Sequence, residues 1–326
     1  MRDSLRDKKI LVTGGAGFIG SHLVDDIIEK KPASVVVVDN FFLGKEENLK
    51  EAKKDFPDLR IYRQDASQFQ AMEKIIRKER IDVVFNLATK ALGYSFVDPD
   101  DAFMVNTNIA SVLLRLLHQK FYKTLIHLSS SEAYGTAKFI PITESHPLDP
   151  QTLYAAGKAA ADLMVNSYFH TYKLDVAIVR PFNNYGPRQN EGSYAAIIPL
   201  TIKRILLGEP PVLEGDGKQT RDFIYVKDTT SATIKIYENE KTRGKTINIA
   251  SGRETSVKDI INSIINTLSY RGKIVRKPPR PADVRRHLAD VTLARKLIGF
   301  EPNIEFEEGL KLTVDWYKNN LKGGKV

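Results

Sequence analysis

The sequence predicts an α/β fold in which a doubly wound parallel sheet carries helices on both faces. In the first 180 residues, apolar runs typical of strands alternate with stretches typical of helices, and this alternation indicates βαβ units. Several of the apolar runs are nearly continuous, as in strands that are covered on both faces. A glycine-rich turn joins the first run to the first helical stretch, where sheets of this kind bind ligands.

The elements of these 180 residues come one after another along the chain. Strands are predicted at Lys9–Thr13, Ser34–Asp39, Arg60–Arg63, Ile81–Leu87, Thr124–Leu128 and Val176–Arg180. Helices are predicted at Ser21–Lys30, Ala71–Arg80, Ala102–Lys120 and Thr152–Tyr172. Because each helix lies between two strands, it can serve as the crossover that parallel strands require.

After Arg180 the pattern becomes irregular, since prolines and glycines punctuate the chain as far as Lys218. The later elements are predicted as a strand at Phe223–Val226, a helix from Thr229, a strand at Thr246–Ile249, and helices at Val257–Leu268 and Glu307–Leu321. We therefore expect a sheet domain at 1–180 and a smaller, irregular α/β domain at 181–326 that covers the ligand. Some elements of the second domain are expected to return to the first.

The composition excludes several classes of protein. Hydrophobic residues make up 42% of the 326 residues, enough for a sizeable core, and the absence of cysteine excludes disulfides, cysteine nucleophiles and thiolate metal sites. The six histidines are not spaced as ligand pairs, so no metal site is expected. The sequence has no run of about 18 apolar residues, so no transmembrane helix is expected. The first nine residues lack the apolar core of a signal peptide. Together these observations predict a cytoplasmic protein.

The formal net charge is +9, from 49 basic and 40 acidic residues. The basic residues are scattered and often adjoin acids, without an aromatic-interleaved basic stripe. This pattern favours a solvated basic surface over a nucleic-acid interface. Part of the excess is expected to serve a phosphate-bearing ligand.

Residues 10–39 have the order strand, glycine turn, helix, strand and acid. Gly14 allows the sharp turn, Gly17 lets the backbone approach a pyrophosphate, and Gly20 lets the helix pack against the strand. The N-terminus of the helix then directs unpaired N–H groups at the phosphates. Asp39 lies about 20 residues past the glycines, where a carboxylate binds ribose hydroxyls.

Together these features predict a Rossmann-type dinucleotide site. Because the carboxylate of Asp39 repels a 2′-phosphate, NAD is favoured over NADP. Further cofactor contacts are expected at the carboxyl ends of the strands and within the turn. These further residues are Phe18, Ile19, Asn40, Asp65, Ala66, Leu87 and Ala88.

Tyr154 and Lys158 form the candidate catalytic pair. They are four residues apart in a predicted helix, so their side chains share one face. An ammonium stabilises a phenolate, so we expect the pKa of Tyr154 to lie below its usual value. A tyrosine of this kind can take a proton from a sugar hydroxyl while a hydride leaves for a nicotinamide. Taken alone, the pair is a common solvated-face pattern; after a dinucleotide fingerprint the catalytic interpretation is favoured.

The motifs together resemble the extended short-chain dehydrogenase/reductase family, specifically its nucleotide-sugar epimerases, dehydratases and decarboxylases. The resemblance spans nearly the whole chain and is carried by Thr13–Gly20, Leu87-Ala88, Ser129–Gly135, Tyr154–Lys158, Arg180–Gln189 and Gly215–Asp228. It implies NAD as cofactor and a nucleoside-diphosphate sugar as substrate. In this comparison 1–180 is the NAD-binding domain and 181–326 the nucleotide-sugar domain.

The resemblance also implies roles for the Ser129–Gly135 segment. Ser130 falls at the catalytic Ser/Thr position and is expected to bond the C4 oxygen of the sugar. Glu132 stands where 4,6-dehydratases carry the base that removes the C5 proton, and nucleotide-glucuronate decarboxylases also carry Glu there. Simple 4-epimerases commonly have a small or neutral residue at this position. Ser131 replaces the Asp of thymidine-type dehydratases and is expected to assist Glu132.

The diphosphate contacts implied by the resemblance lie in the second half of the chain. Asn183 and Arg221 resemble family residues that contact and neutralise the diphosphate, since guanidinium geometry suits phosphate oxygens. Arg280 resembles a second diphosphate contact, with Asp283 near the ribose. Arg188 is included among the substrate contacts.

Some residues depart from the family pattern. Asn86 stands where the family often has His, and Thr89 where it often has a second Ala. Lys90 is unusual beside the site; it could reach a phosphate or a carboxylate, but we expect it to face solvent. His127 is interpreted as a satisfied core residue, and no Gly-x-Ser-x-Gly motif indicates a serine hydrolase.

The first functional hypothesis is 4,6-dehydration of a nucleotide hexose or N-acetylhexosamine. The alternatives are 4-epimerisation of the UDP-glucose or UDP-N-acetylglucosamine type, and then decarboxylation of UDP-glucuronate. An NAD-sensing binding protein without turnover is expected to have lost Tyr154 or Lys158, and both are present.

By analogy with the family we expect a homodimer that joins helices Ala102–Lys120 and Thr152–Tyr172 in a four-helix bundle, where Ala155, Ala159 and Ala160 would allow close approach.

Overall fold

The structure is a computed structural model that describes residues 4–279 and 284–321. Its centre is a parallel sheet of seven strands in the order β11-β6-β5-β4-β1-β2-β3. The strands are β1 Lys9–Thr13, β2 Ser34–Asp39, β3 Arg60–Arg63, β4 Val83–Asn86, β5 Thr124–Leu128, β6 Val176–Pro181 and β11 Thr246–Ile249. The prediction of a doubly wound parallel sheet is confirmed, and β4 is shorter than expected at both ends.

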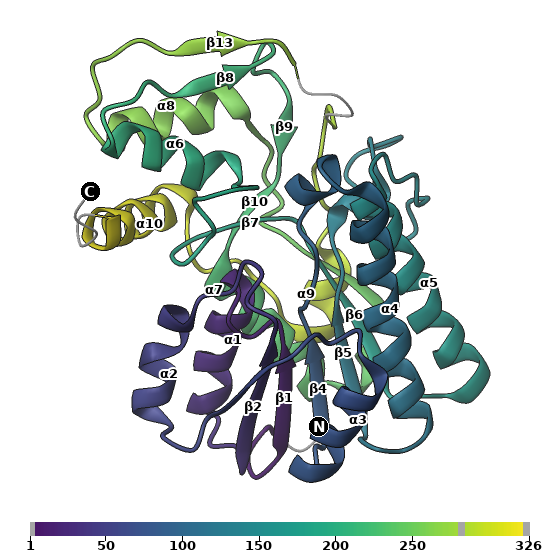
Figure 1. The fold of residues 1–326 in the computed structure, drawn as a ribbon. Coiled ribbons are helices and arrows are strands. Elements are labelled where there is room, and N and C mark those ends of the chain that lie inside the picture. The colour runs from purple at the N-terminus through teal and green to yellow at the C-terminus, as the bar shows by residue number, and fades with distance from the viewer. Residues whose placement is uncertain (1–3, 280–283, 322–326) are drawn as a thin grey trace.

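Helices cover both faces of the sheet (Figure 1). They are α1 Phe18–Glu29, α2 Lys50–Asp55, α3 Phe69–Glu79, α4 Pro99–His118, α5 Leu153–Tyr172, α6 Ile197–Leu206, α7 Val226–Glu238, α8 Val257–Thr267, α9 Thr292–Ile298 and α10 Phe306–Leu321. Short 3₁₀ turns are η1 Glu46–Leu49, η2 Leu92–Phe96, η3 Ser131–Tyr134 and η4 Glu240–Thr242. Among the described residues, no helix has both the length and the apolar character needed to cross a bilayer.

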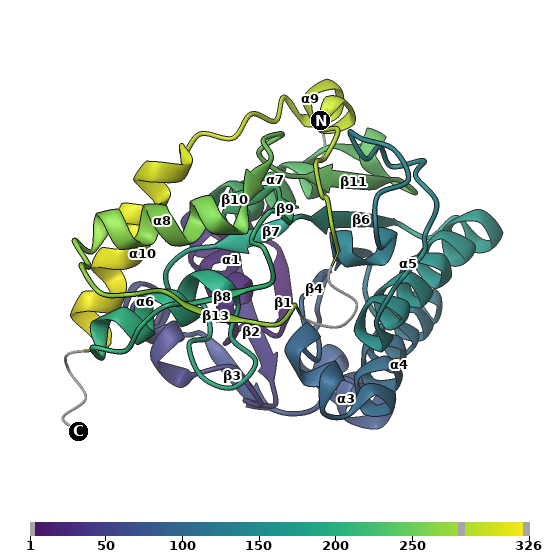
Figure 2. The ribbon, with the colours of Figure 1, turned by 90° about the horizontal axis from the view of Figure 1, so that it is seen from above.

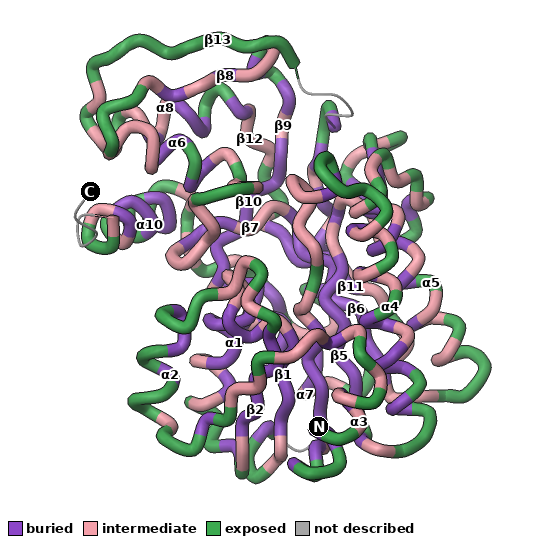
Figure 3. The backbone as a smooth tube through the Cα atoms, viewed as in Figure 1, coloured by how far each residue is buried: buried purple, intermediate pink, exposed green. Residues whose placement is uncertain are grey.

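Successive residues of each strand supply the two halves of the core. Ile10 and Val12 pack in a cluster that includes Leu23 of α1 and Ile236 of α7, whereas Leu11 packs in a second cluster with helices α3, α4 and α5. Apart from the edge strand β3, whose Arg60 and Arg63 are exposed, the strands are therefore buried on both faces, as Figure 3 shows along the centre of the molecule. This explains the nearly continuous apolar runs.

Part of the chain after residue 181 returns to the sheet. Strand β11 pairs in parallel with β6, and α7 packs against α1. Helix α9 contacts β11 and α7. Most of the remaining elements form a smaller unit above the carboxyl ends of the strands (Figures 1 and 2). Its strands form three short pairs, β7 Asn183–Tyr185 with β10 Phe223–Tyr225, β8 Val212–Glu214 with β13 Val275–Lys277, and β9 Thr220–Arg221 with β12 Thr255–Ser256.

Local capping decides where the helices that reach the site begin. The side chain of Thr152 accepts a hydrogen bond from the N–H of Ala155 and starts α5, so Tyr154 lies in the first turn of the helix. Helix α1 begins at Phe18, three residues before the predicted start, because the extended backbone of Gly17 forms its N-cap. Helix α7 likewise begins at Val226 rather than Thr229.

Candidate active site

A cavity of about 570 Å³ lies where the carboxyl ends of the strands meet the smaller unit. It is lined by every predicted site residue that the structure describes. These are Gly14, Gly17, Phe18, Ile19, Gly20, Asp39, Asn40, Asp65, Ala66, Leu87, Ala88, Ser130, Ser131, Glu132, Tyr154, Lys158, Asn183, Arg188 and Arg221. The two other predictions, Arg280 and Asp283, lie outside the described residues.

The glycine turn is built for close approach. Gly14 has φ +68°, and a Cβ there would lie 2.7 Å from the backbone nitrogen of Ala88. A Cβ on Gly20 would lie 2.1 Å from the carbonyl oxygen of Gly14, so any side chain would push helix α1 away from the turn. No side chain caps the N-terminus of α1, which leaves its first N–H groups available for an anion such as a pyrophosphate.

Asp39 has a second task that the sequence did not indicate. Its Oδ2 accepts a hydrogen bond from the N–H of Ala16 at 2.9 Å, and its Oδ1 accepts one from the N–H of Phe41 at 2.8 Å. Burial raises the pKa of Asp39, and these backbone bonds oppose the rise. The carboxylate therefore braces the glycine turn while it lines the cavity, and its oxygens keep further acceptor capacity for ribose hydroxyls. Together with the uncapped helix, these residues fit NAD.

A buried polar chain fixes the floor of the cavity. The Oγ1 of Thr13 donates to Oδ1 of Asn86 at 2.7 Å and accepts from the N–H groups of Leu87 and Ala88. The Nδ2 of Asn86 lies 2.9 Å from Nδ1 of His127 on the neighbouring strand. An imidazole is thus present beside position 86, although β5 supplies it. The interpretation of His127 as a satisfied core residue is only half right, because its buried Nε2 has no hydrogen-bond partner.

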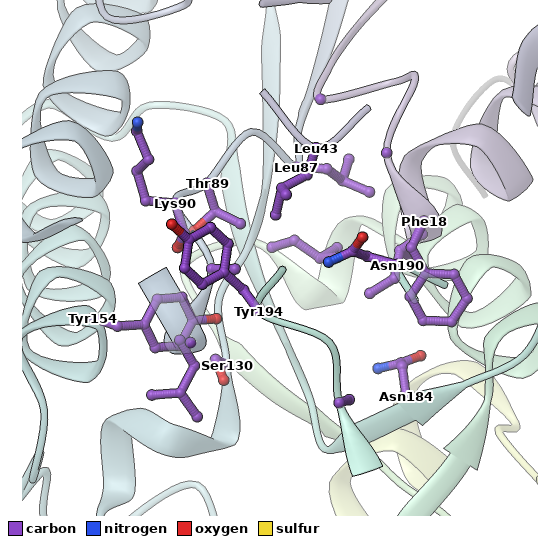
Figure 4. A pocket seen from close by; sticks show the side chains of 18 of the residues that line it. Phe18, Leu43, Leu87, Thr89, Lys90, Ser130, Tyr154, Asn184, Asn190 and Tyr194 are labelled. Atoms are coloured by element: carbon purple, nitrogen blue, oxygen red, sulfur yellow. The ribbon is translucent and has the colours of Figure 1, made fainter. Parts of the chain in front are cut away.

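Turn η3 carries the residues that are expected to handle the sugar. Ser130 caps this turn, and its hydroxyl accepts from the N–H of Glu132 at 3.2 Å. Figure 4 shows the hydroxyl of Tyr154 directed into the cavity near Ser130. Ser130 hydrogen-bonds the Tyr154 side chain, and the charge of Glu132 acts on the same phenol. Ser130, Glu132 and Tyr154 therefore face one place in the cavity.

The expected direction of the Tyr154 pKa is wrong for the protein itself. Burial raises the pKa of Tyr154 to about 12; the hydrogen bond from Ser130 opposes the rise, while the charges of Glu132 and Asp162 add to it. Burial is the largest cause of this shift, and the ammonium of Lys158 donates to the carbonyl oxygen of Leu128 at 2.6 Å. Burial lowers the pKa of Lys158 to about 8, and the charge of Asp162 opposes that decrease.

The arginines at the other end of the cavity already hold protein partners. The Nη1 of Arg221 donates to the carbonyl oxygens of Val284 at 2.6 Å and Thr220 at 2.9 Å. Arg188 forms an ion pair with Asp25 of α1 at 2.7 Å, with 15% of its side chain exposed. Both guanidinium groups are thereby oriented, as phosphate recognition requires.

Asp222 is the main structural residue of this end that sequence reasoning missed. Its carboxylate accepts from the N–H groups of Ser251, Gly252 and Ala289 and from the hydroxyl of Ser251. Burial raises its pKa to about 6. Asp222 thus fastens the strand that carries Arg221 to the loop after β11. The sequence feature that could have indicated Asp222 is its position next to Arg221 within the Gly215–Asp228 segment.

The expectation that Lys90 faces solvent is wrong. Its side chain is 14% exposed and pairs with Asp101 of α4 at 3.1 Å. Its Nζ lies 3.8 Å from the ring centre of Phe42 and 4.4 Å from that of Tyr94. Tyr194 of the smaller unit stacks on Phe42 and meets Tyr94 edge-on. The lysine is largely covered because Asp101 and the rings of Phe42 and Tyr94 surround its ammonium, and Phe42 comes from a segment about fifty residues earlier that no local pattern links to Lys90.

A family model described as GDP-mannose 4,6 dehydratase matches residues 11–313 of the chain. A relative described as a putative UDP-glucose 4-epimerase of Methanocaldococcus jannaschii is 33% identical over 95% of this chain and 99% of its own length. A UDP-N-acetyl-alpha-D-glucosaminuronate decarboxylase of Bacillus cytotoxicus is 34% identical over 95% of this chain and 98% of its own.

Solved structures of nucleotide-sugar epimerases and dehydratases are also similar to this chain. The UDP-glucose 4-epimerase of Thermotoga maritima, solved with UDP-glucose, has a TM-score of 0.90 at 35% identity, covering 96% of this chain and 99% of that one. The dTDP-glucose 4,6-dehydratase DesIV of Streptomyces venezuelae, solved with NAD, has a TM-score of 0.91 at 29% identity, covering 97% and 98%. The cavity, the cofactor fit and these matches agree. The chain belongs to the extended short-chain dehydrogenase/reductase family and is one of its NAD-dependent enzymes of the nucleotide-sugar epimerase and dehydratase type.

Proposed function

We propose that this enzyme is a 4,6-dehydratase of a nucleoside-diphosphate hexose or N-acetylhexosamine, acting through a transient 4-keto sugar. The observation that carries the proposal is a carboxylate, Glu132, in the same cavity as Tyr154 and close enough for its charge to act on that phenol. Elimination of water needs a base that reaches C5 of the sugar after C4 has been oxidised. Neither 4-epimerisation nor the oxidation itself needs one.

Each residue then has a defined task. Tyr154 takes the proton of the C4 hydroxyl, whose oxygen Ser130 holds, and Lys158 supplies positive charge below the phenolate. When bound, NAD would accept the C4 hydride and, once water has left, return it to C6 while C5 takes up the proton held by Tyr154; its cationic ring would add to the charge that favours the phenolate. With a ketone at C4, Glu132 removes the acidified C5 proton and delivers a proton to the departing C6 hydroxyl, so that water leaves. Ser131 assists at that step.

The second candidate is 4-epimerisation, and the third is decarboxylation of a nucleotide glucuronate. The 35% identity to an epimerase solved with UDP-glucose favours the former. The 34% identity to a glucosaminuronate decarboxylase favours the latter. Both share oxidation at Tyr154 with the dehydratase and differ in the step after oxidation. Glu132 would be dispensable in the epimerase.

The test is to incubate the purified protein with UDP-, GDP- and dTDP-sugars, including UDP-glucuronate, and to monitor the products by mass spectrometry. Loss of one water supports the proposal. Unchanged mass with a new C4 isomer replaces it with epimerisation, and loss of carbon dioxide replaces it with decarboxylation. A protein that binds NAD and alters none of these sugars contradicts all three.

We further propose that the enzyme is a cytoplasmic homodimer whose contact surface lies on α4 and α5. The outer face of these helices exposes Met104, Leu163 and Tyr172, with 52%, 58% and 51% of each residue accessible. Exposed apolar side chains on neighbouring helices are typical of an interface. Ala155 and Ala159 are excluded from it, contrary to expectation, because both are buried within the protomer. There, helices α4 and α5 pack against each other.

A further inference from the structure

A buried carboxylate lies directly behind the catalytic lysine. Asp162 comes four residues after Lys158 on α5, so the two share a face of the helix, and Asp162 has no exposed surface. Its Oδ2 accepts a hydrogen bond from Oγ of Ser129 at 2.6 Å and another from Arg180 at 2.5 Å. Its Oδ1 has no hydrogen-bond partner. Such a buried charge is costly unless it neutralises another.

His127 shows how Oδ1 is oriented. Because the amide Oδ1 of Asn86 accepts from Thr13, its Nδ2 donates to Nδ1 of His127. Burial and the charges of Lys158 and Arg180 lower the pKa of His127, which keeps the ring neutral, so its one proton is on Nε2. This N–H faces Oδ1 of Asp162 at 3.7 Å. The neutral imidazole therefore faces the carboxylate without forming a hydrogen bond to it and without neutralising its charge.

The charges do not balance in this cluster. Lys158 is 4% exposed and Arg180 is 3% exposed, and the single carboxylate of Asp162 acts on both. Arg180 holds it directly, whereas Lys158 has its ammonium on the carbonyl oxygen of Leu128. The two cations therefore compete for one buried anion.

We propose that Asp162 is a positioning residue whose charge, shared between Lys158 and Arg180, keeps Lys158 protonated beneath Tyr154. Asp162 touches neither substrate nor cofactor in this role and acts only through the lysine and the phenol. The inference rests on the part of the proposed function that dehydration, epimerisation and decarboxylation have in common, oxidation at Tyr154. It does not depend on the task of Glu132.

Charged groups on the other neighbouring elements leave this assignment intact. From η3, the charge of Glu132 acts on Tyr154, and it stays in place in every variant below. On α4, Asp101 is paired with Lys90. The ring of Tyr134 lies under the guanidinium of Arg180 at 4.4 Å. A change confined to Asp162 therefore reports on Lys158 and Tyr154.

The test compares R180Q with D162N/R180Q, which differ only in the charge at position 162. Removing Asp162 alone would leave Arg180 buried and unpaired, which risks unfolding the protein, whereas the double variant removes both charges. UDP-glucose, GDP-mannose and dTDP-glucose are first mixed with the wild-type holoenzyme. The sugar nucleotide that yields most reduced nicotinamide is the probe, and its single-turnover reduction rate is measured against pH for each variant.

In R180Q, Asp162 serves Lys158 alone, so the alkaline limb of the profile is expected to move to higher pH. In D162N/R180Q, Lys158 loses its proton more readily and Tyr154 ionises more readily, so both limbs move to lower pH. The two variants are expected to differ by about one pH unit or more. A merely structural role would lower the rate without separating the profiles.

If R180Q and D162N/R180Q both fold and their pH–rate profiles superimpose, the proposal is overturned. Should the double variant not fold, R180Q against wild type decides: an upward movement of the alkaline limb supports the proposal, and an unmoved limb overturns it. If no sugar nucleotide reduces the nicotinamide of the wild-type enzyme, the proposed function fails, and this inference fails with it. That outcome is distinct from a wild type that works and variants that do not separate.

Discussion

At the scale of single residues, burial has opposite effects on the pKa values of the two members of the candidate catalytic pair, Tyr154 and Lys158. It raises the pKa of Tyr154 to about 12 and lowers that of Lys158 to about 8, because in each case the charged form loses solvation. Both shifts favour a neutral phenol beside a neutral amine. Positive charge near the phenol would favour the phenolate, and the negative charge of Asp162 favours the protonated form of Lys158. The ionisation of the pair therefore depends on charged groups outside the Tyr154–Lys158 motif.

Replacing Glu132 with Gln is expected to separate the oxidation step from the elimination step. The amide keeps the shape of the side chain but cannot remove the C5 proton, so formation of the dehydrated product is expected to fall at least about 100-fold. Reduction of the bound nicotinamide is expected to persist. Mass spectrometry of the product and absorbance of the reduced nicotinamide measure the two steps. Glu47→Gln, at an exposed glutamate, is the matched control. An unchanged rate of elimination in E132Q would contradict the proposed role of Glu132.

At the scale of elements, the N-terminus of α1 is held in place from two sides. Gly20 brings the helix against the turn, and Asp39 bonds the backbone of Ala16 from the end of β2. Further along the helix, the ring of His22 contacts the carbonyl oxygen of Pro187 at 3.0 Å. The cofactor end of the cavity therefore depends on contacts between segments that lie far apart in the sequence.

The variant Gly20→Ala is expected to weaken NAD binding at least about tenfold, or about 1.4 kcal/mol. The new methyl group would lie 2.1 Å from the carbonyl oxygen of Gly14, and backbone must shift to relieve the contact. Titration of the cofactor-stripped protein with NAD measures the change. Gly192→Ala is the control, because the nearest atom to its Cβ would be 3.5 Å away. Equal affinities of the two variants would contradict the close-packing argument.

His22 is expected to make the protein less stable in mild acid. Burial and the charge of Arg188 lower its pKa from 6.5 to about 3. Below pH 6.5 the unfolded chain takes up a proton that the folded protein refuses, so the stability present above that pH is lost as pH falls towards the folded value. The loss reaches about 2 kcal/mol at pH 5.

His22→Gln keeps a donor for the carbonyl of Pro187 and does not titrate. Its melting temperature should therefore fall less between pH 7 and pH 5 than that of the wild type, whereas the exposed His170→Gln should behave as wild type. Parallel pH dependence in H22Q and wild type would show that His22 is not the titrating group.

At the scale of the whole molecule, two parts of the chain, the sheet and the smaller unit, line one cavity. The seven-stranded sheet presents the carboxyl ends of its strands, and the smaller unit lies over them (Figure 2). Arg221 and Tyr194 of that unit line the cavity. The cluster of Lys90 and Phe42 meets Tyr194 across this cleft. Substrate and cofactor would therefore be enclosed between parts of the chain that lie far apart in the sequence.

Leu163→Glu is expected to convert a dimer into a monomer. A charge on the most exposed leucine of α5 would have to be buried against a partner helix, which costs several kcal/mol without a counter-charge. Light scattering of the purified protein gives the mass in solution. Leu207→Glu, also at an exposed leucine but on the smaller unit, is the control. A wild type that is monomeric at working concentration, or an L163E protein that stays dimeric, would refute this interface.

The features that the sequence determined by itself are local and periodic. The six strands before residue 181, the glycine turn and the Tyr154–Lys158 spacing result from patterns within a few tens of residues, and the structure brings all described candidate residues to one cavity. Only the tertiary structure decided the environment of each charge. Lys90 became paired with Asp101, Asp39 came to hold the backbone of the glycine turn, and Asp162 came to pair with Arg180 while its charge also acts on Lys158. The physical reason is that desolvation and Coulomb interactions depend on which distant groups approach, and a linear pattern does not encode these distances.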